Sequence, residues 1–306
     1  MSRPDRTAPG QRAWDQDGWW RAHRFLVLRR LSQATLLGLF LVGPWFGFWL
    51  VKGTLAASLT LDTLPLTDPF IALQSLLAGH LPESSALVGV ALVLIAYIML
   101  GGRVYCAWVC PINPITDGAH WLRERLDLDK GWRLDRRAKY WLLAAALLVS
   151  LVGGTVAWEA VNPITILHRE LIYGGLVAGS LGWTVIIAVF AFDLLVSRRG
   201  WCGHVCPVGA FYGLVGRLSL LRVSAHRPAA CDDCMDCYAV CPEPHVITPA
   251  IKAMDRGPVI LSQDCSNCGR CIDVCAPAVF RYAWRGDVRT EEPSVPIGTE
   301  QRRQAA

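Results

Sequence analysis

The sequence has few histidines, few methionines and few charged residues, and these shortages exclude several classes of protein. It holds 7 histidines and 4 methionines, and neither gathers into the tracts typical of copper-binding proteins. Only 18% of the residues are charged, and no basic run interleaves with aromatic side chains, which argues against nucleic-acid binding despite a net charge of +5. A Ser/His/Asp set, a phosphate-binding loop and a molybdenum pterin signature are also missing.

Apolar residues, in contrast, are abundant and lie in long blocks. They form 53% of the 306 residues, and the mean hydropathy is +0.33. Runs close to the length that spans a membrane lie at residues 31–51, 85–101, 140–158 and 174–196. A secretory signal is the competing interpretation of the first run, but its basic lead is too long and its apolar part too extended. The pattern predicts four transmembrane helices.

Lysine and arginine are distributed unevenly between the segments that join these runs. Residues 1–30, 102–139 and 197–306 hold 7, 8 and 13 of them, whereas the two opposite loops hold only Lys52 and Arg169. The positive-inside rule therefore predicts both termini and the C-terminal cysteine-rich part in the cytoplasm; with the resemblance described below, the expected location is the bacterial inner membrane, crossed several times. Thiols stay reduced in the cytoplasm, which disfavours disulfides.

Eight of the twelve cysteines form two groups with the same spacing, C-x2-C-x2-C-x3-C. In two-cluster ferredoxins the fourth cysteine of each group ligates the other cluster, so the spacing predicts two [4Fe-4S] clusters. The expected ligands of the first are Cys231, Cys234, Cys237 and Cys275, and those of the second are Cys265, Cys268, Cys271 and Cys241. Zinc is the alternative, but zinc modules usually present separated C-x2-C pairs.

The other four cysteines belong to an internal repeat. Residues 103–112 match residues 199–208, each copy with the motif C-x3-C-P, and an Asp-Pro pair at 68–69 matches an Asn-Pro pair at 162–163. The membrane part is therefore predicted to be a duplicated hairpin around an axis along the membrane normal. The repeat cysteines, which would meet at one depth, are Cys106, Cys110, Cys202 and Cys206. They are packing residues, redox or docking thiols, or ligands of an additional redox metal centre, and our hypothesis is the last.

These patterns predict a membrane α-helical protein with a C-terminal α+β two-cluster ferredoxin-like domain. The expected divisions are a cytoplasmic N-terminal segment, a four-helix transmembrane domain, the ferredoxin-like domain and a disordered tail. Their bounds are 1–30, 31–224, 225–285 and 286–306.

Five runs carry a resemblance to a known family, at residues 18–24, 65–69, 106–117, 200–209 and 234–245. They resemble the NapH family, the membrane ferredoxin-type subunits of periplasmic nitrate reductase systems, and the likeness covers roughly residues 17–284. The resemblance implies quinol oxidation and electron delivery, with a periplasmic ferredoxin-type partner, to a molybdenum nitrate reductase. Ala276 interrupts the second C-P pair and leaves the ligands intact.

Polar residues in the last outer loop and the last apolar run are candidates for further roles. Glu159 and His168 lie where a proton acceptor would serve a quinol, and we predict them as quinol-side residues; the alternative is that they are solvated loop residues. Asp193 lies within an apolar run, where carboxylates are commonly functional, but it is close enough to Arg198 for a structural ion pair.

Two other functions remain open. Relatives with the same cysteine plan are associated with copper enzyme assembly, so the chain is alternatively a metal-centre maturation protein, although the missing copper tracts disfavour this. The second of these other functions is that of a non-catalytic membrane anchor that docks a soluble ferredoxin. Electron transfer from cytoplasmic clusters to periplasmic acceptors also requires a relay across a hydrocarbon core of ~30 Å.

Overall fold

The structure is a computed structural model that describes residues 8–128, 131–132, 134–173, 181–252, 257–287 and 289–290. The chain forms two compact units. Unit 1 contains residues 1–26 and 220–306, and unit 2 contains residues 27–219. Of the expected tail at 286–306, only residues 286–287 and 289–290 are described.

Each of the four predicted apolar runs contains a helix. These are α2 (Trp19–Phe46), α4 (Ser84–Leu100), α6 (Ala138–Gly153) and α8 (Leu181–Ala191), which continues as the π-helix η3 (Phe192–Val196). Helix α2 is long and apolar enough to cross a membrane, whereas the other three are shorter apolar helices. Residues 174–180, where the fourth run begins, lie outside the described residues.

The observed helix ends differ from the predicted ones for local reasons. Helix α2 begins twelve residues before the expected start at residue 31, because the aromatic and basic lead is itself helical. Helix α6 stops at Gly153 rather than at Trp158. The next residue, Gly154, has a φ of 62° and its N–H donates to the carbonyl of Ser150 at 3.1 Å, which caps the helix.

A three-stranded antiparallel sheet between α2 and α4 was not predicted from the sequence. Its strands are β1 (Val51–Gly53), β2 (Ala57–Thr60) and β3 (Leu64–Thr67), in that order. Pro65 is tolerated because β3 pairs only with β2, so it is an edge strand that does not need every N–H.

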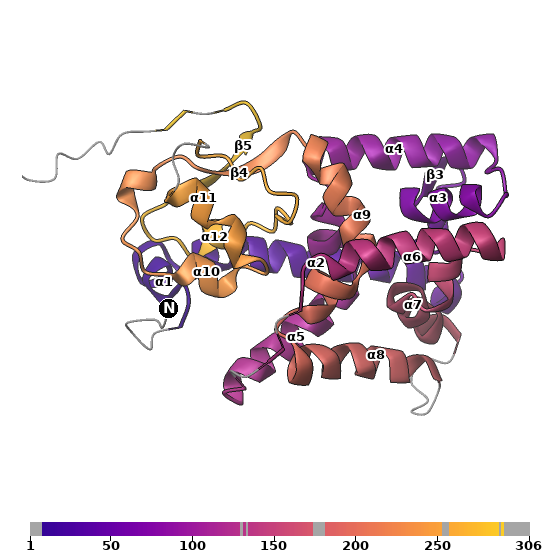
Figure 1. Cartoon of the computed structure of the whole chain (residues 1–306), viewed down its shortest axis with the longest axis horizontal. Helices are drawn as coiled ribbons and strands as arrows, with labels where there is room; N and C mark the ends of the chain where they lie inside the picture. Colours follow the sequence, from indigo (N-terminus) through magenta and orange to yellow (C-terminus); the bar gives the residue numbers. More distant parts are fainter. Residues whose placement is uncertain are drawn as a thin grey trace, which may run out of the picture. The chain divides into compact units, whose positions relative to one another are not determined.

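Two short helices follow the repeated X-Pro pairs. They are α3 (Pro69–Leu77) and α7 (Pro163–Tyr173). The Asp68 carboxylate accepts from the N–H of Phe70 at 2.7 Å, and the Asn162 amide oxygen accepts from the N–H of Ile164 at 3.1 Å. Each cap satisfies a free N–H of the first turn, and proline needs none at the first helical position. Within unit 2, α3 packs against both α4 and α6 (Figure 1).

The rest of unit 2 consists of short helical segments around the cysteine repeats. They are η1 (Tyr105–Val109), α5 (Ile112–Arg125), η2 (Ala157–Ala160), η4 (Trp201–Val205), α9 (Pro207–Val215) and η5 (Gly216–Leu218). Residues from several of these segments share one apolar core with α3, α6, α7 and α8.

Unit 1 combines a two-stranded antiparallel sheet with short helices. Strands β4 (Leu221–Ala225) and β5 (Phe280–Trp284) pair from Leu221 with Trp284 to Ala225 with Phe280. The helical segments are α1 (Gln11–Asp17), η6 (Pro228–Ala230), α10 (Asp236–Val240), η7 (Pro244–Val246), α11 (Thr248–Ile251) and α12 (Arg270–Asp273). The expected α+β ferredoxin-like character is therefore present.

The described part of the N-terminal segment, residues 8–26, belongs to unit 1. Asp236 accepts from the N–H of Gly10 at 3.0 Å. Asp273 accepts from the N–H groups of Phe25 and Leu26 at 3.2 and 3.1 Å. Carboxylate–amide hydrogen bonds are among the stronger ones, so the described residues 8–26 are tied to the helices that carry the cysteines.

We expect Gly269→Ala to weaken this attachment. Gly269 has a φ of 74°, and a Cβ there would approach Cγ of Phe25 to 2.5 Å. Strain and overpacking together should cost about 2 kcal/mol, or ~5 °C in the midpoint of thermal unfolding followed by cluster absorbance. Gly286→Ala is the matched control because its Cβ would meet no atom within 4 Å. Equal midpoints for the two variants would contradict the packing described.

Candidate metal centres

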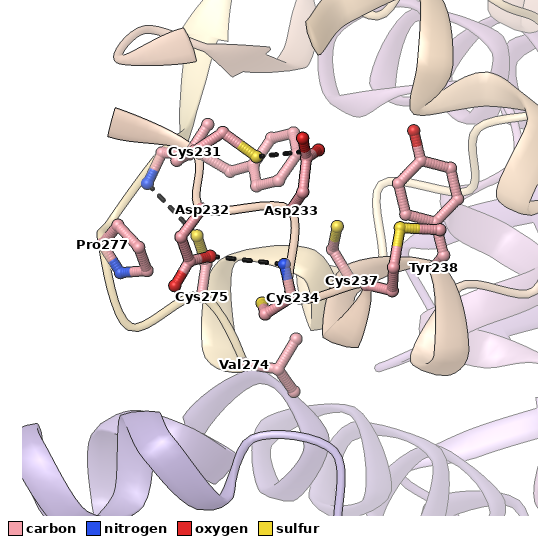
Figure 2. A pocket seen from close by; sticks show the side chains of 12 residues that line it. Cys231, Asp232, Asp233, Cys234, Cys237, Tyr238, Val274, Cys275 and Pro277 are labelled. Carbon is pink, nitrogen blue, oxygen red and sulfur yellow. Dashed lines mark hydrogen bonds between the residues drawn. The ribbon is translucent and has the colours of Figure 1, made fainter. Parts of the chain in front are cut away.

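The eight ferredoxin-type cysteines line two cavities in unit 1. The first cavity is lined by Cys231, Cys234, Cys237 and Cys275, as Figure 2 shows, and the second by Cys241, Cys265, Cys268 and Cys271. Each cavity thus receives three cysteines from one group and the last cysteine of the other. These are the groupings that the spacing predicts for two clusters.

The two cysteine loops have the same unusual backbone. Asp233 and Met235 in the first loop have φ values of 55° and 65°, and Asn267 and Gly269 at the equivalent positions have 47° and 74°. Left-handed residues in a tight loop help turn neighbouring N–H groups to one side, which forms a concave anion-binding surface. Such a loop suits the negative charge of a thiolate-ligated cluster. This repeated backbone is an observation, independent of cysteine spacing, that fits a cluster in each cavity.

Burial disfavours the thiolate form of two of these cysteines. It raises the pKa of Cys237 to about 12 and that of Cys275 to about 11, because a thiolate is poorly solvated there. The N–H of Val279 donates to Sγ of Cys275 at 3.3 Å, which favours the thiolate. A cationic metal core would supply the larger compensation. Among the described residues, no three Cys, His, Asp or Glu side chains converge closely enough to hold a single ion.

The two C-x3-C-P motifs adopt the same local structure in unit 2. Cys106 lies in the π-helix η1 and Cys202 in the π-helix η4. The N–H of Cys110 donates to the carbonyl of Tyr105 and that of Cys206 to the carbonyl of Trp201, both at 2.9 Å and both five residues back. Single π-turns are rare and concentrate at functional sites.

The second cysteine of each motif lies at the start of a helix. Cys110 precedes α5 and receives the N–H groups of Ile112 and Asn113, while Cys206 precedes α9 and receives those of Val208 and Gly209. The proline after each cysteine has no N–H, so the next two N–H groups of the first turn are left to point at the sulfur. These donors favour a thiolate at both positions.

The two motifs approach each other crosswise. A Cβ added to Gly209, in the second repeat, would lie 4.0 Å from Sγ of Cys106 in the first. Thr116, in the first repeat, has its hydroxyl 3.7 Å from Sγ of Cys202 in the second. Cys110 also interacts electrostatically with both Cys106 and Cys206. The four repeat cysteines therefore lie within electrostatic range of one another.

Two buried cations lie near this group, and the sequence analysis missed them. Arg103 is 4% exposed, donates to the carbonyl of Cys202 at 3.2 Å and hydrogen-bonds to the thiol of Cys106. Lys139 is 1% exposed and also acts electrostatically on Cys106. Burial raises the pKa of Cys106, and these two cations oppose that rise. Their only sequence signal is Arg103 at the start of the first repeat.

Among the described residues, no hydrogen bond or ion pair joins the predicted quinol-side residues to the repeat cysteines. His168 is 1% exposed on α7, and neither ring nitrogen has a hydrogen-bond partner among the described residues. Its ring meets the edge of Phe40 at 5.6 Å, and burial lowers its pKa, which favours the neutral imidazole. Glu159 is half-buried and accepts from the side-chain amide of Asn162 at 3.2 Å.

Asp193 does not form the expected ion pair with Arg198. Its carboxylate is fully buried and accepts from the N–H of Trp201 at 2.7 Å. The exposed Arg198 lies 3.5 Å from Glu124 instead. Asp193 therefore fixes the start of the second π-helical motif, which is a structural role through a different partner.

Comparison with known families agrees with both sets of cysteines. Residues 85–128 and 176–226, which contain the two C-x3-C-P motifs, match a family described as a 4Fe-4S binding domain. Residues 224–276 match a family described as a 4Fe-4S dicluster domain. No solved structure matches the chain.

Curated relatives match over nearly the full length. The methylamine utilization ferredoxin-type protein MauN of Methylorubrum extorquens is 54% identical over 88% of this chain and 92% of its own. The ferredoxin-type protein NapH of Escherichia coli is 48% identical over 90% and 95%, and that of Haemophilus influenzae is 47% identical over 91% and 96%. The chain therefore belongs to the NapH family of ferredoxin-type proteins, which includes close relatives named MauN, and it is an iron–sulfur electron-transfer protein.

Proposed function

We propose that the protein is a membrane-bound subunit that oxidises quinol and passes the electrons towards a periplasmic nitrate reductase. The observation that carries this proposal is the meeting of four cysteines and two buried cations inside the apolar unit 2. An electron acceptor there lies in the same unit as the apolar helices, where a lipid-soluble donor is available. Iron–sulfur clusters bound by the cysteines supply one-electron redox chemistry.

We infer that all four apolar helices cross the membrane, with both termini in the cytoplasm. Helices α4 and α6 expose large apolar side chains along much of their length, among them Leu87, Leu92, Ile95, Leu148 and Val152. Exposed apolar surface of that extent suits lipid better than water. A helix of 17 residues spans about 25 Å, which is short for a 30 Å core, so local thinning of the bilayer accompanies this arrangement.

The cysteines of unit 1 would hold two [4Fe-4S] clusters in the crosswise sets given above. The four repeat cysteines would hold an additional centre, which we infer to be iron–sulfur. A four-iron core with four thiolates carries a net negative charge, which is costly to bury in an apolar unit. Arg103 and Lys139 are placed to offset that charge, and this is why we favour a metal centre over simple packing of four thiols.

Glu159 and His168 are proposed to serve the quinol. Oxidation of a quinol releases two protons, so a site for it needs nearby acceptors. Burial favours the neutral form of His168, and neither ring nitrogen has a partner in the described parts of the chain, which is an unusual and costly arrangement unless a ligand completes it. Glu159 offers a carboxylate from the same outer segment.

The identity of the terminal acceptor separates two versions of this function. The MauN relatives, by their name, serve methylamine utilization, and their identities of 48–54% favour a second candidate in which the electrons serve that process. The test is to reconstitute the protein with quinol and each electron-transfer system in turn. Reduction of a periplasmic nitrate reductase system, but not of a methylamine utilization system, would support the first version. A maturation role or a docking role without redox turnover remains the alternative if neither system is reduced.

Iron and acid-labile sulfide should be present at about eight each per chain from unit 1, and about four more each from the repeat cysteines. Chemical analysis of the anaerobically purified full chain measures both. Cys234→Ser should lower the iron and sulfide content because it removes a ligand in unit 1, and Cys206→Ser because it removes a ligand in unit 2. The two losses should add in the double variant. Zinc in place of iron, or no loss with Cys206→Ser, would contradict the assignment of the respective site.

Arg103→Gln should lower the midpoint potential of the unit 2 centre. Removing one nearby positive charge stabilises the oxidised state by about 2 kcal/mol at an effective dielectric constant of about 20, or on the order of 100 mV for one electron. Redox titration by EPR would follow the signal that is lost in Cys206→Ser. Arg103→Lys retains the charge and should shift the potential much less; equal shifts in both variants would rule out the electrostatic role.

Replacing both His168 and Glu159 by Ala should slow quinol-dependent reduction while dithionite still reduces every centre. Stopped-flow absorbance with a short-chain quinol compares the two donors directly. Loss of a positioned proton acceptor typically costs 10²–10⁴-fold, and we expect at least ~100-fold here. Unchanged turnover in the double variant would remove these residues from the proposed site.

A further inference from the structure

Asp68 is a carboxylate in unit 2, and the equivalent position of the second repeat is occupied by an amide, Asn162. It caps α3 through the N–H of Phe70, and Asn162 caps α7 in the equivalent way through the N–H of Ile164. An amide therefore suffices for the cap, and only the first repeat has a group there that can ionise. Cap geometry alone does not explain why a carboxylate occupies this position.

The surroundings of Asp68 are half-buried and rich in hydroxyl groups. The Tyr212 hydroxyl donates to its carboxylate, and the N–H of Ile71 is a second backbone donor beside that of Phe70. Tyr97 from α4 and Tyr105 from η1 also face it electrostatically, and Glu159 from η2 acts on it as a like charge. Among the described residues, Asp68 makes no ion pair.

This group of tyrosines also connects Asp68 with the repeat cysteines. Tyr212 stacks on Tyr105 with ring centroids 4.9 Å apart, and Tyr97 meets Tyr212 at 5.0 Å. Tyr105 and Tyr97 both interact electrostatically with Asp68 and with Cys106 and Cys110. A carboxylate and an electron-accepting centre thus lie on two sides of one aromatic cluster.

We propose that Asp68 accepts a proton from quinol as the quinol is oxidised beside the four repeat cysteines. This inference rests on the proposed function, which supplies the quinol and the iron–sulfur acceptor. In the step, a quinol O–H bond breaks, the proton goes to a carboxylate oxygen of Asp68, and one electron goes to the acceptor. The second O–H proton goes to Glu159, the other carboxylate within electrostatic reach of Asp68, and the second electron goes to the same acceptor after it has passed the first electron on to a [4Fe-4S] cluster of unit 1.

The protonation chemistry of Asp68 suits this task. Burial raises its pKa to about 6, against the lowering effect of the donors at Phe70, Tyr212 and Ile71. A proton acceptor works best when its pKa lies near the operating pH, because it is then ionised and still basic enough to take the proton. The Tyr212 hydroxyl stabilises the ionised form, so Tyr212 is a positioning residue.

The test uses the full-length protein with its clusters, duroquinol as donor, and stopped-flow reduction measured across pH. The wild-type rate should rise as the pH rises through about 6 and then level off, as Asp68 ionises. Asp68→Asn keeps the cap and should be at least ~100-fold slower with no such rise. Asp62→Asn, which removes an exposed carboxylate paired with Lys52 in the same segment, is the matched control and should behave as wild type.

Two further readouts separate this role from a structural one. Tyr212→Phe removes a hydrogen-bond donor to the Asp68 carboxylate, so the rise in rate with pH should occur at higher pH than in wild type. This shift tests the role of Asp68 even if Asp68→Asn does not assemble its clusters. Redox-difference infrared spectra should show a protonated carboxyl band on quinol addition that Asp68→Asn lacks. If wild type oxidises duroquinol and both variants keep its rate and pH profile, the inference is overturned and the proposed function stands. If wild type oxidises no quinol, the proposed function itself fails.

Discussion

The structure depends on one electrostatic constraint, which is that a buried thiolate needs positive charge or hydrogen-bond donors close to its sulfur. Burial raises the pKa of Cys237, Cys275 and Cys206 to about 11–12, so without compensation these groups remain thiols. Both units meet the constraint with backbone N–H groups at their cysteine loops. Unit 2 adds two buried cations, Arg103 and Lys139, because its apolar helices offer less solvation.

In each unit, the cysteine site is built from residues of both halves of a repeated sequence. In unit 1, each cavity takes its last cysteine from the other half of the repeat. In unit 2, the helix after each C-x3-C-P motif lies beside the first cysteine of the other motif, as Gly209 does at Cys106 and Thr116 at Cys202. A site built from both halves exists only when both halves are folded together. Assembly of the metal centres is therefore coupled to correct packing of each unit.

The sequence predicted the features that are set by local spacing and missed those that depend on packing. Cysteine spacing determines the two groups in unit 1, and the matching Asp-Pro and Asn-Pro pairs indicated a repeat, although the capped helices α3 and α7 that follow them were not predicted. The π-turns at Cys106 and Cys202 were not predictable, because an i, i+4 pair reads as ordinary helix. Lys139 was counted only among the eight basic residues of the segment 102–139, and its burial near the cysteines follows from tertiary packing. The attachment of residues 8–26 to unit 1 rests on Asp236 and Asp273, which are more than 200 residues away in sequence.

The central claim is that electrons from quinol enter at the four repeat cysteines of unit 2 rather than at the ferredoxin-type clusters. Rapid freeze-quench EPR after mixing the intact, oxidised protein with a quinol tests it most directly. The account predicts that the signal absent from Cys206→Ser appears first, and that Cys206→Ser leaves the ferredoxin-type signals unreduced by quinol although dithionite still reduces them. Reduction of the ferredoxin-type clusters by quinol at the same rate in wild type and Cys206→Ser would contradict it.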